Sequence, residues 1–263
     1  MRELERDDLP SPMSTTPLIV VGRGRVGSSL AAAAEAAGIA VTLVSREEVE
    51  SVPTGAAVLL CVPDDAIAAA AERFSAAEPS LIGHVSGAST LEVLAAAAER
   101  GARAFSIHPL QTFADGTAPM EGTPAAIAGA DPEASAYARA LAQSLGMRPF
   151  EVPEESRAAY HAAAAMASNL LVALEESAAE VLTRIGVEDA RELLAPIVLR
   201  TAANWVERGP AALTGPIARG DRATVQRHRV ALAESAPELV RLYDVLAMRA
   251  EAIAWESVHG VSS

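Results

Sequence analysis

The sequence predicts an α/β fold in its first half and an all-α fold in its second half. Segments with strand and helix patterns alternate up to residue 153, which is typical of a doubly wound parallel sheet. A glycine-rich turn separates the first predicted strand from the first predicted helix. From residue 154 onward the strand pattern stops and helical segments follow. We therefore expect a flexible tail over residues 1–16, an α/β domain over residues 17–153 and a helical domain over residues 154–263.

The glycine-rich turn has the spacing G-x-G-x-x-G, in Gly22-Arg-Gly-Arg-Val-Gly27. In a dinucleotide-binding turn the first glycine allows a tight bend, the second lets the backbone approach a pyrophosphate, and the third lets the helix pack against the strand. The N–H groups and positive dipole end of the helix then face the phosphate. A plain strand–helix turn is the alternative. The expected cofactor residues of this turn are Gly22, Gly24, Arg25, Val26 and Gly27.

The second predicted strand, residues 38–44, ends in Ser45 and Arg46. A Rossmann fold that binds NAD usually carries an acidic side chain there, which binds the ribose 2′-hydroxyl. A hydroxyl and a guanidinium suit a 2′-phosphate instead, through charge-assisted hydrogen bonds. The sequence therefore favours NADP(H) over NAD(H). Glu47 and Glu48 follow directly, so an acidic side chain that turns inward remains an alternative.

The third predicted strand, residues 55–62, is continuously apolar, as in a sheet buried on both faces. Its carboxyl end adjoins the glycine turn, at the edge where such sheets bind ligands. We therefore expect Val62 and Pro63 to cover the cofactor. Asp64 and Asp65 are expected to begin the next helix, where acidic side chains match the helix dipole.

The fourth and fifth predicted strands, residues 81–85 and 102–107, are each followed by a polar side chain, Ser86 and His108. These two side chains are expected to face one cleft, because both strands end at the same edge. Pro109 holds His108 in an extended segment. A hydrogen bond that only ties the loop is an equally good role for His108. Two further strands are expected at residues 125–129 and 147–152.

Helix ends are marked by several local signals. Asp131-Pro132 predicts a capped helix with proline at its first position. Ser89-Thr-Leu-Glu92 and Ser235-Ala-Pro-Glu238 match the capping box. In the second half we expect one long helix over residues 155–185, a second over residues 187–208, a loop over residues 211–220, a third helix capped by Asp221, and a fourth ending near Trp255.

The long predicted helix would align His161, Ser168 and Asn169, at positions i, i+7 and i+8, on one apolar face. Buried polar groups need partners, because leaving one unpaired costs about 1–3 kcal/mol. A shared polar cleft would supply them, and a helix–helix hydrogen-bond seam is the alternative. In a cleft, His161 would be a general acid and Asn169 would orient a carbonyl or carboxylate. Arg219, in the loop before Asp221, would clamp a substrate carboxylate or remain a surface charge.

The amino-acid composition argues against several classes of protein and site. The net charge of −13 argues against a nucleic-acid surface. The single cysteine, Cys61, excludes an internal disulfide, suits the reducing cytoplasm and lies in an apolar strand, where a buried thiol is expected rather than a nucleophile. No apolar segment reaches about 18 uncharged residues, so no membrane span is expected. No His/Cys cluster has metal-ligand spacing.

Several of these segments together resemble one family. They are the glycine turn, Val62-Pro-Asp-Asp-Ala-Ile67, Ser86-Gly-Ala88, Ser106-Ile-His-Pro-Leu-Gln-Thr-Phe113, Tyr160-His-Ala-Ala163 with Ser168-Asn169, and Leu213-Thr-Gly-Pro-Ile-Ala-Arg-Gly-Asp221. Over about residues 17–250 the chain resembles the Rossmann-like plus DUF2520 family, a branch of the 6-phosphogluconate-dehydrogenase-like and pyrroline-5-carboxylate-reductase-like reductases. The resemblance implies an NADP-binding Rossmann domain and a C-terminal domain of the 6-phosphogluconate dehydrogenase C-terminal type that pairs in a homodimer. Some members resemble ketopantoate reductases of pantothenate synthesis.

The chain departs from these reductases at one position. The 3-hydroxyacid and ketopantoate branches use a lysine four residues before the helix asparagine, where this chain has Ala165. His161, one turn earlier, is the natural substitute as proton donor. The resemblance thus implies an NADPH-dependent reductase of a small 2-oxo acid, with Ser86, His108 and His161 near the nicotinamide and Asn169 and Arg219 on the substrate. An imine reductase and a non-catalytic NADP-binding sensor or partner protein are the alternatives.

Overall fold

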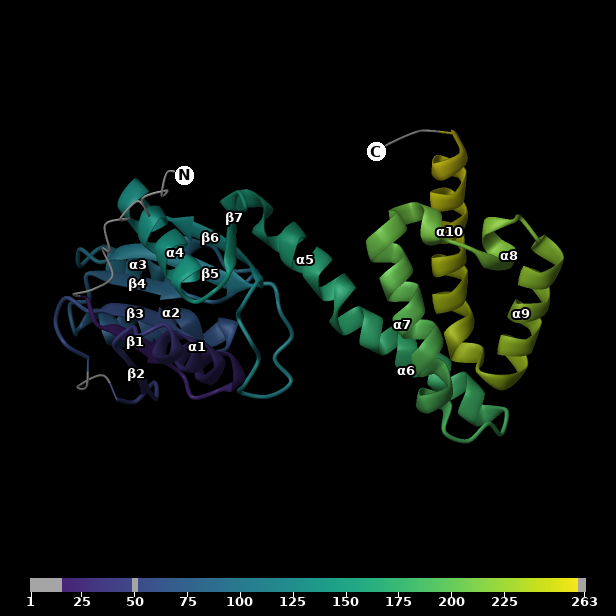
Figure 1. The fold of residues 1–263 in the computed structure, drawn as a ribbon, viewed down its shortest axis with the longest axis horizontal. Coiled ribbons are helices and arrows are strands. Elements are labelled where there is room, and N and C mark those ends of the chain that lie inside the picture. Colours follow the sequence, from purple (N-terminus) through teal and green to yellow (C-terminus); the bar gives the residue numbers. More distant parts are fainter. Residues whose placement is uncertain (1–15, 49–51, 260–263) are drawn as a thin grey trace, which may run out of the picture. The chain divides into compact units, whose positions relative to one another are not determined.

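The structure, a computed structural model, describes residues 16–48 and 52–259. It divides into two compact units, Met1–Ala165 and Met166–Ser263, which are described separately (Figure 1). The division lies within a helix, α5 (Arg157–Ala167), and not between residues 153 and 154. The tail expected at residues 1–16 lies outside the described residues, except for Thr16.

The first unit is built on a seven-stranded sheet with the order β2-β1-β3-β4-β5-β6-β7. The strands are β1 (Leu18–Val21), β2 (Val41–Val44), β3 (Ala57–Leu60), β4 (Leu81–His84), β5 (Arg103–Pro109), β6 (Pro124–Gly129) and β7 (Arg148–Glu151). All neighbours are parallel except β5 and β6, which are antiparallel. The predicted parallel sheet is confirmed for the other pairs, and the β5–β6 pair is the exception. A loop joins β5 to β6, and a parallel pair would need a crossover element there.

Helices cover both faces of this sheet (Figure 1). α1 (Arg25–Ala36) and α4 (Pro132–Ser144) pack on one face, and α2 (Ile67–Ser75) and α3 (Ala95–Ala98) pack on the other. The two cores share the central strands, whose side chains are buried on both faces, as the apolar third strand predicted. This confirms an α/β Rossmann fold for the first unit.

Two of the predicted helix caps are present and two are absent. The Asp131 carboxylate accepts the N–H of Ala134 at 2.8 Å, and the Asp221 carboxylate accepts that of Thr224 at 3.0 Å. The two predicted capping boxes do not form. The helical turn η3 (Leu91–Leu94) has no side-chain cap, and the Ser235 hydroxyl donates to the carbonyl of Ala231 instead.

The second unit is helical, as predicted, with different boundaries. After α5, the helices are α6 (Asn169–Arg184), α7 (Ala190–Arg208), α8 (Gly215–Ala218), α9 (Arg222–Ser235) and α10 (Val240–His259). The expected single helix over residues 155–185 is wrong: it is interrupted at Ser168, whose φ of −128° and ψ of −81° are not helical. The predicted loop over residues 211–220 contains α8.

The helical unit buries few large side chains. Among residues 166–257 and residue 259, the buried hydrophobic residues are all alanines, namely Ala179, Ala190, Ala236 and Ala247. Large apolar side chains such as Leu199, Trp205 and Val206 are 65–78 % exposed. Within the described part of the chain, the helices are too short or too polar to span a bilayer.

Candidate active site

The glycine turn connects β1 to α1, and two of its glycines have no room for a side chain. A Cβ on Gly22 would lie 2.3 Å from the Cys61 carbonyl oxygen, and a Cβ on Gly27 would lie 1.9 Å from the Gly22 carbonyl oxygen. Gly22 also has a φ of +111°, which favours glycine. The close packing of α1 on the strand therefore depends on these two residues. Val26 packs against the adjoining core.

Gly24 is different, because a Cβ there would have nothing within 4 Å. It is the N-cap residue of α1 and offers no side-chain cap, so the first N–H groups of the helix lack intrahelical partners. The exposed backbone and these N–H groups form a suitable cradle for an anion. The turn lies between β2 and β3, where the order of the strands reverses and open α/β sheets bind their ligands. The residues present therefore fit a dinucleotide pyrophosphate.

The tip of β2 holds two arginine–glutamate pairs. Glu48 accepts the backbone N–H of Ser45 and lies 3.1 Å from Nη2 of Arg23. The hydrogen bond from Ser45, followed by the charge of Arg23, lowers the pKa of the Glu48 carboxyl. Arg46 pairs with Glu47 at 2.9 Å. The Glu48 carboxylate thus folds back onto Ser45 and Arg23 while its side chain stays exposed, and Arg23 joins the predicted Ser45 and Arg46 at the place where a Rossmann fold holds its ribose.

The loop between β5 and β6 lies against the start of α1. Nη1 of Arg25 donates to the Phe113 carbonyl at 3.3 Å, and the N–H of Ala118 donates to the Ser29 hydroxyl at 3.2 Å. Arg25 therefore ties this loop beside the glycine turn. On the other side of the turn, Val62 is half-buried and Pro63 is exposed, directly after β3.

Ser86 is buried at the end of β4, and its hydroxyl closes the turn that follows. The hydroxyl donates to Asp64 Oδ2 at 2.8 Å and accepts the N–H groups of Ala88 at 3.2 Å and Ser89 at 3.0 Å. Asp64 lies in the short helical turn η2 (Asp64–Ala66) after β3, so this hydrogen bond joins the ends of two neighbouring strands. The Ser86 hydroxyl is therefore fully engaged by protein groups.

Two imidazoles converge on Gly87. A Cβ on Gly87 would lie 2.5 Å from Nδ1 of His161 and 2.7 Å from Nε2 of His108. The two rings are 5.7 Å apart, and the Tyr160 hydroxyl lies 2.7 Å from Nδ1 of His108. His161 Nδ1 is buried and has no hydrogen-bond partner among the described residues. The structure thus brings together His108 and His161, both selected from the sequence, and adds Tyr160.

His108 is held neutral at pH 7. Its pKa is lowered to about 4, first by burial, then by the charges of His161 and Arg157, while Asp64 acts in the opposite direction. With Tyr160 on Nδ1, the other ring nitrogen of His108 is directed toward Gly87. A neutral imidazole in this position can accept or donate one hydrogen bond to a bound molecule. Because its protonated form is scarcely populated at pH 7, His108 is a poor general acid.

Asn169 and Arg219 belong to the second unit. The interruption at Ser168 places Asn169 at the start of α6, so it does not share one continuous helix face with His161. The Ser168 hydroxyl donates to Asn169 Oδ1 at 3.1 Å. Arg219 directly follows α8, and both Asn169 and Arg219 are exposed.

Three residues of the first unit belong to this site although they were not among the residues predicted for it. They are Asp64 as the partner of Ser86, Tyr160, and Arg157 at the start of α5. Arg157, Tyr160 and His161 are spaced i, i+3 and i+4, which places them on one helix face. This helical spacing is the feature of the sequence from which the grouping of Arg157 and Tyr160 with His161 was predictable. Within the described ranges, no group of three His, Cys, Asp or Glu side chains is suited to hold a metal.

Comparisons with known proteins agree with this architecture. Residues 123–250 match the family described as "Domain of unknown function (DUF2520)". Over these residues the match agrees with the resemblance to the DUF2520 family that the sequence motifs indicated. A search of curated proteins gives no match.

Three solved structures illustrate the similarity of fold. A Bacteroides fragilis protein named as a candidate NADP oxidoreductase has 22% identity and a TM-score of 0.75, over 90% of this chain and 98% of that chain. Protein TM1727 of Thermotoga maritima has 24% identity and a TM-score of 0.74, over 91% and 99%. Pyrroline carboxylate reductase of Plasmodium falciparum, with NADP bound, has 14% identity and a TM-score of 0.56, over 91% and 99%. At these identities the comparison establishes the fold of the chain.

Proposed function

We propose that this protein is an NADP(H)-dependent oxidoreductase that reduces the carbonyl group of a small 2-oxo acid such as ketopantoate. One observation carries the proposal. The open glycine turn after β1 and the paired imidazoles beside Gly87 lie along the same edge of one sheet. An anion cradle and a cluster of proton-transfer groups at this edge are the two parts that a nicotinamide-dependent reductase requires.

The residues around the turn support the choice of cofactor. The backbone at Gly24 and the first N–H groups of α1 would hold the pyrophosphate, with Gly22, Val26 and Gly27 setting the close approach of helix and strand. A 2′-phosphate would be held by Ser45, Arg46 and Arg23 at the tip of β2. When bound, NADPH supplies the hydride. The Plasmodium falciparum structure, of the same fold, holds NADP.

The protein's side chains would position the substrate and move its proton. His161 is the proposed donor to the oxygen that gains negative charge, since histidine is the most frequent general acid in enzymes and the buried Nδ1 of His161 needs a partner. Neutral His108, oriented by Tyr160, would hydrogen-bond the substrate carbonyl. Val62 and Pro63 would cover the cofactor ribose. Substrate binding by Asn169 and Arg219 is proposed from the sequence, and a role in pantothenate synthesis would follow from this substrate.

A second candidate is an imine reductase. An imine of the pyrroline-5-carboxylate kind is already protonated when hydride arrives, so it requires no strong acid. Neutral His108 suits such a reaction, because it adds no positive charge beside a cationic substrate. The fold is shared with a pyrroline carboxylate reductase. A protein that binds NADP without turnover, as a sensor or partner, is the third possibility and would have the same turn.

The proposal is tested by oxidation of NADPH, with NADH alongside, in the presence of ketopantoate, other 2-oxo acids and cyclic imines. Rapid oxidation of NADPH with a 2-oxo acid is expected. His161→Ala should then lower kcat about 10²-fold or more with little change in cofactor affinity, and His228→Ala, on α9, should not. Turnover of imines with full activity in His161→Ala would favour the imine reductase. Binding of NADPH without any turnover across the panel would favour the sensor.

We also propose that the protein is a homodimer through its helical unit. The buried hydrophobic residues of that unit, within the described part, are alanines, whereas Val206, Leu199 and Trp205 are at least 65 % exposed. Exposed apolar area of this extent is unusual for a monomer and marks an interaction surface. A dimer mass in solution at micromolar concentration is expected. A monomer mass there would contradict the proposal.

The compartment we propose is the cytoplasm. The chain has one cysteine, Cys61, so it cannot form an internal disulfide. Burial raises the pKa of the Cys61 thiol, which keeps it protonated and unreactive. A reducing compartment suits such a protein.

A further inference from the structure

Arg157, at the start of α5, is the largest completely buried side chain in the described part of the chain. A buried guanidinium is rare, since its removal from water is costly unless it is paired and hydrogen-bonded. The contacts of the buried Arg157 side chain therefore indicate its role in the structure.

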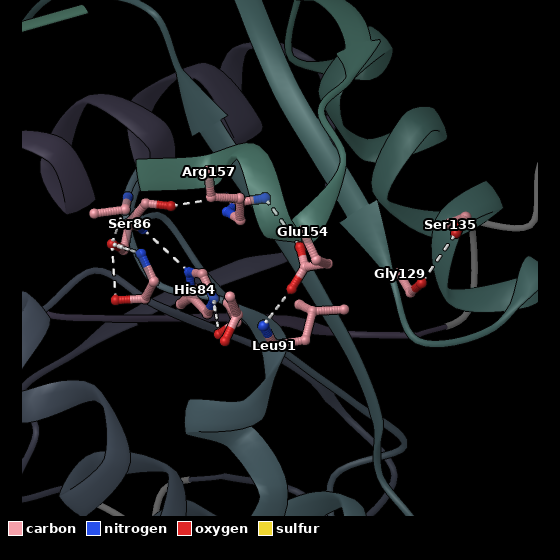
Figure 2. A network of polar contacts seen from close by, with 10 residues as sticks. His84, Ser86, Leu91, Gly129, Ser135, Glu154 and Arg157 are labelled. Atoms are coloured by element: carbon pink, nitrogen blue, oxygen red, sulfur yellow. Dashed lines mark hydrogen bonds and ion pairs between the residues drawn. The ribbon is translucent and has the colours of Figure 1, made fainter. Parts of the chain in front are cut away.

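Arg157 contacts the turn after β4 (Figure 2). Its Nη2 donates to the Ser86 carbonyl at 2.9 Å, and its Nη1 lies 3.4 Å from Glu154 Oε1. Glu154 Oε2 in turn accepts the N–H of Leu91 at 2.7 Å. Glu154, in the helical turn η4 (Glu154–Ser156), and Arg157, at the start of α5, thus hold the two ends of the segment 86–91.

His84 holds the same segment from the strand side (Figure 2). Its Nδ1 accepts the N–H of Ser86 at 3.2 Å, and its Nε2 lies 3.3 Å from the Thr90 carbonyl oxygen. One ring nitrogen accepts and the other donates, so these contacts require a neutral imidazole. The segment is therefore fixed between β4 and α5.

We propose that Arg157 is a positioning residue that clamps the Ser86–Gly87 turn against the imidazoles of His108 and His161. The helix that begins at Arg157 carries Tyr160 and His161 one turn later. Its anchor on the Ser86 carbonyl consequently sets how closely those side chains approach Gly87, where no Cβ would fit.

The charge of Arg157 has a second effect on the same site. It helps to lower the pKa of His84 and of His108, after the larger effect of burial. The other titratable groups that face these rings are Asp64, His161 and Tyr160. Lysine would retain the charge but lack the planar fork that reaches both Ser86 and Glu154.

The clamp can be tested without a substrate, by NMR of the full chain, which has five histidines. In Arg157→Gln, His84 and His108 should titrate about 0.5 pH unit or more above their wild-type values, and the amides of Ala88, Ser89 and Leu91 should exchange faster. In Arg157→Lys, the same amides should exchange faster than in the wild type, while the titration midpoints of His84 and His108 should stay near their wild-type values. Arg139→Gln, which removes an exposed pair with Glu151, should change neither.

Wild-type titrations and wild-type amide exchange in a folded Arg157→Gln protein would overturn the proposal. If Arg157→Gln does not fold, Arg157→Lys decides: faster exchange supports the clamp, and unchanged exchange overturns it. The benefit of the clamp for turnover rests on the proposed function, but these readouts do not. An inactive substrate panel would therefore count against the function and leave the clamp standing.

Discussion

The hydroxyl of Tyr160 lies 2.7 Å from Nδ1 of His108, across 52 residues of sequence. This contact joins α5 to the end of β5 and directs the other ring nitrogen of His108 at Gly87. The ring of His108 consequently has a fixed orientation before anything binds. Pre-orientation of this kind is what a hydrogen-bonding group in an active site requires.

Tyr160→Phe removes this hydrogen bond and leaves the shape of the site nearly unchanged. We expect kcat to fall about tenfold or more because His108 loses its fixed orientation, with a stability loss of about 1 kcal/mol. Steady-state kinetics and denaturant unfolding measure the two effects. Tyr243→Phe is the matched control, since Tyr243 makes the same contact with His228 in the helical unit, at 2.8 Å. Equal kinetics in the two variants would remove Tyr160 from the site.

Gly87→Ala places a methyl group where both imidazoles crowd the backbone. The methyl carbon would lie 2.5 Å from His161 Nδ1 and 2.7 Å from His108 Nε2, so the rings or the turn must move. We expect a loss of about 10²-fold in turnover and a stability loss of about 1–3 kcal/mol. Affinity for NADPH serves as the internal control and should change little. Wild-type turnover would show that the rings do not act at this position.

The parts of this fold that the sequence predicted are those encoded locally. The glycine turn, the apolar strands and the Asp131 cap each depend on a few adjacent residues, and all are present. The direction of β6 was not predictable in this way, because an apolar strand has the same pattern in either direction. The interruption at Ser168 was missed because the alanine-rich segment around it has high helix propensity throughout.

The candidate site was predictable in part. His108 and His161 were identified from the strand end and the helix face, and they lie together. Arg157 was missed because an arginine at the start of a helix is normally solvated, and its burial depends on a carbonyl 71 residues away in the chain. The contact of Glu48 with Ser45 and Arg23 was not predictable, since several backbone angles decide where a loop carboxylate points.

Acid should destabilise the first unit through His84. Its folded-state pKa is lowered from 6.5 to about 4, first by burial and then by the charge of Arg157. Between these values the unfolded chain binds more protons than the folded one, so the free energy of unfolding decreases as pH falls from 6.5 toward 4. The loss for this residue is about 3 kcal/mol. His84→Gln should flatten the decline in urea unfolding between these pH values, and His228→Gln should not. An unchanged slope in His84→Gln would contradict this account.

The arginines at the tip of β2 should discriminate between the two cofactors. Arg23→Ala and Arg46→Ala are each expected to weaken NADPH binding about tenfold and NADH binding less, because NADH lacks the 2′-phosphate. Glu48→Gln should improve NADPH relative to NADH, since it removes a carboxylate that pairs with Arg23. Calorimetric titration measures these affinities, with Arg73→Ala on α2 as the control. Equal losses for both cofactors would mean that the arginines do not bind the 2′-phosphate.

The most direct test of the central claim is NADPH binding by the wild-type protein and by Gly24→Val. A Cβ at Gly24 would have no atom within 4 Å apart from its chain neighbours, and the φ of −76° suits valine, so the variant should fold with a Tm near that of the wild type. The same side chain would occupy the path by which a pyrophosphate reaches the start of α1. We expect the wild type to bind NADPH and Gly24→Val to bind it at least about tenfold more weakly. Equal affinity in the two proteins, or no binding by the wild type, would contradict it.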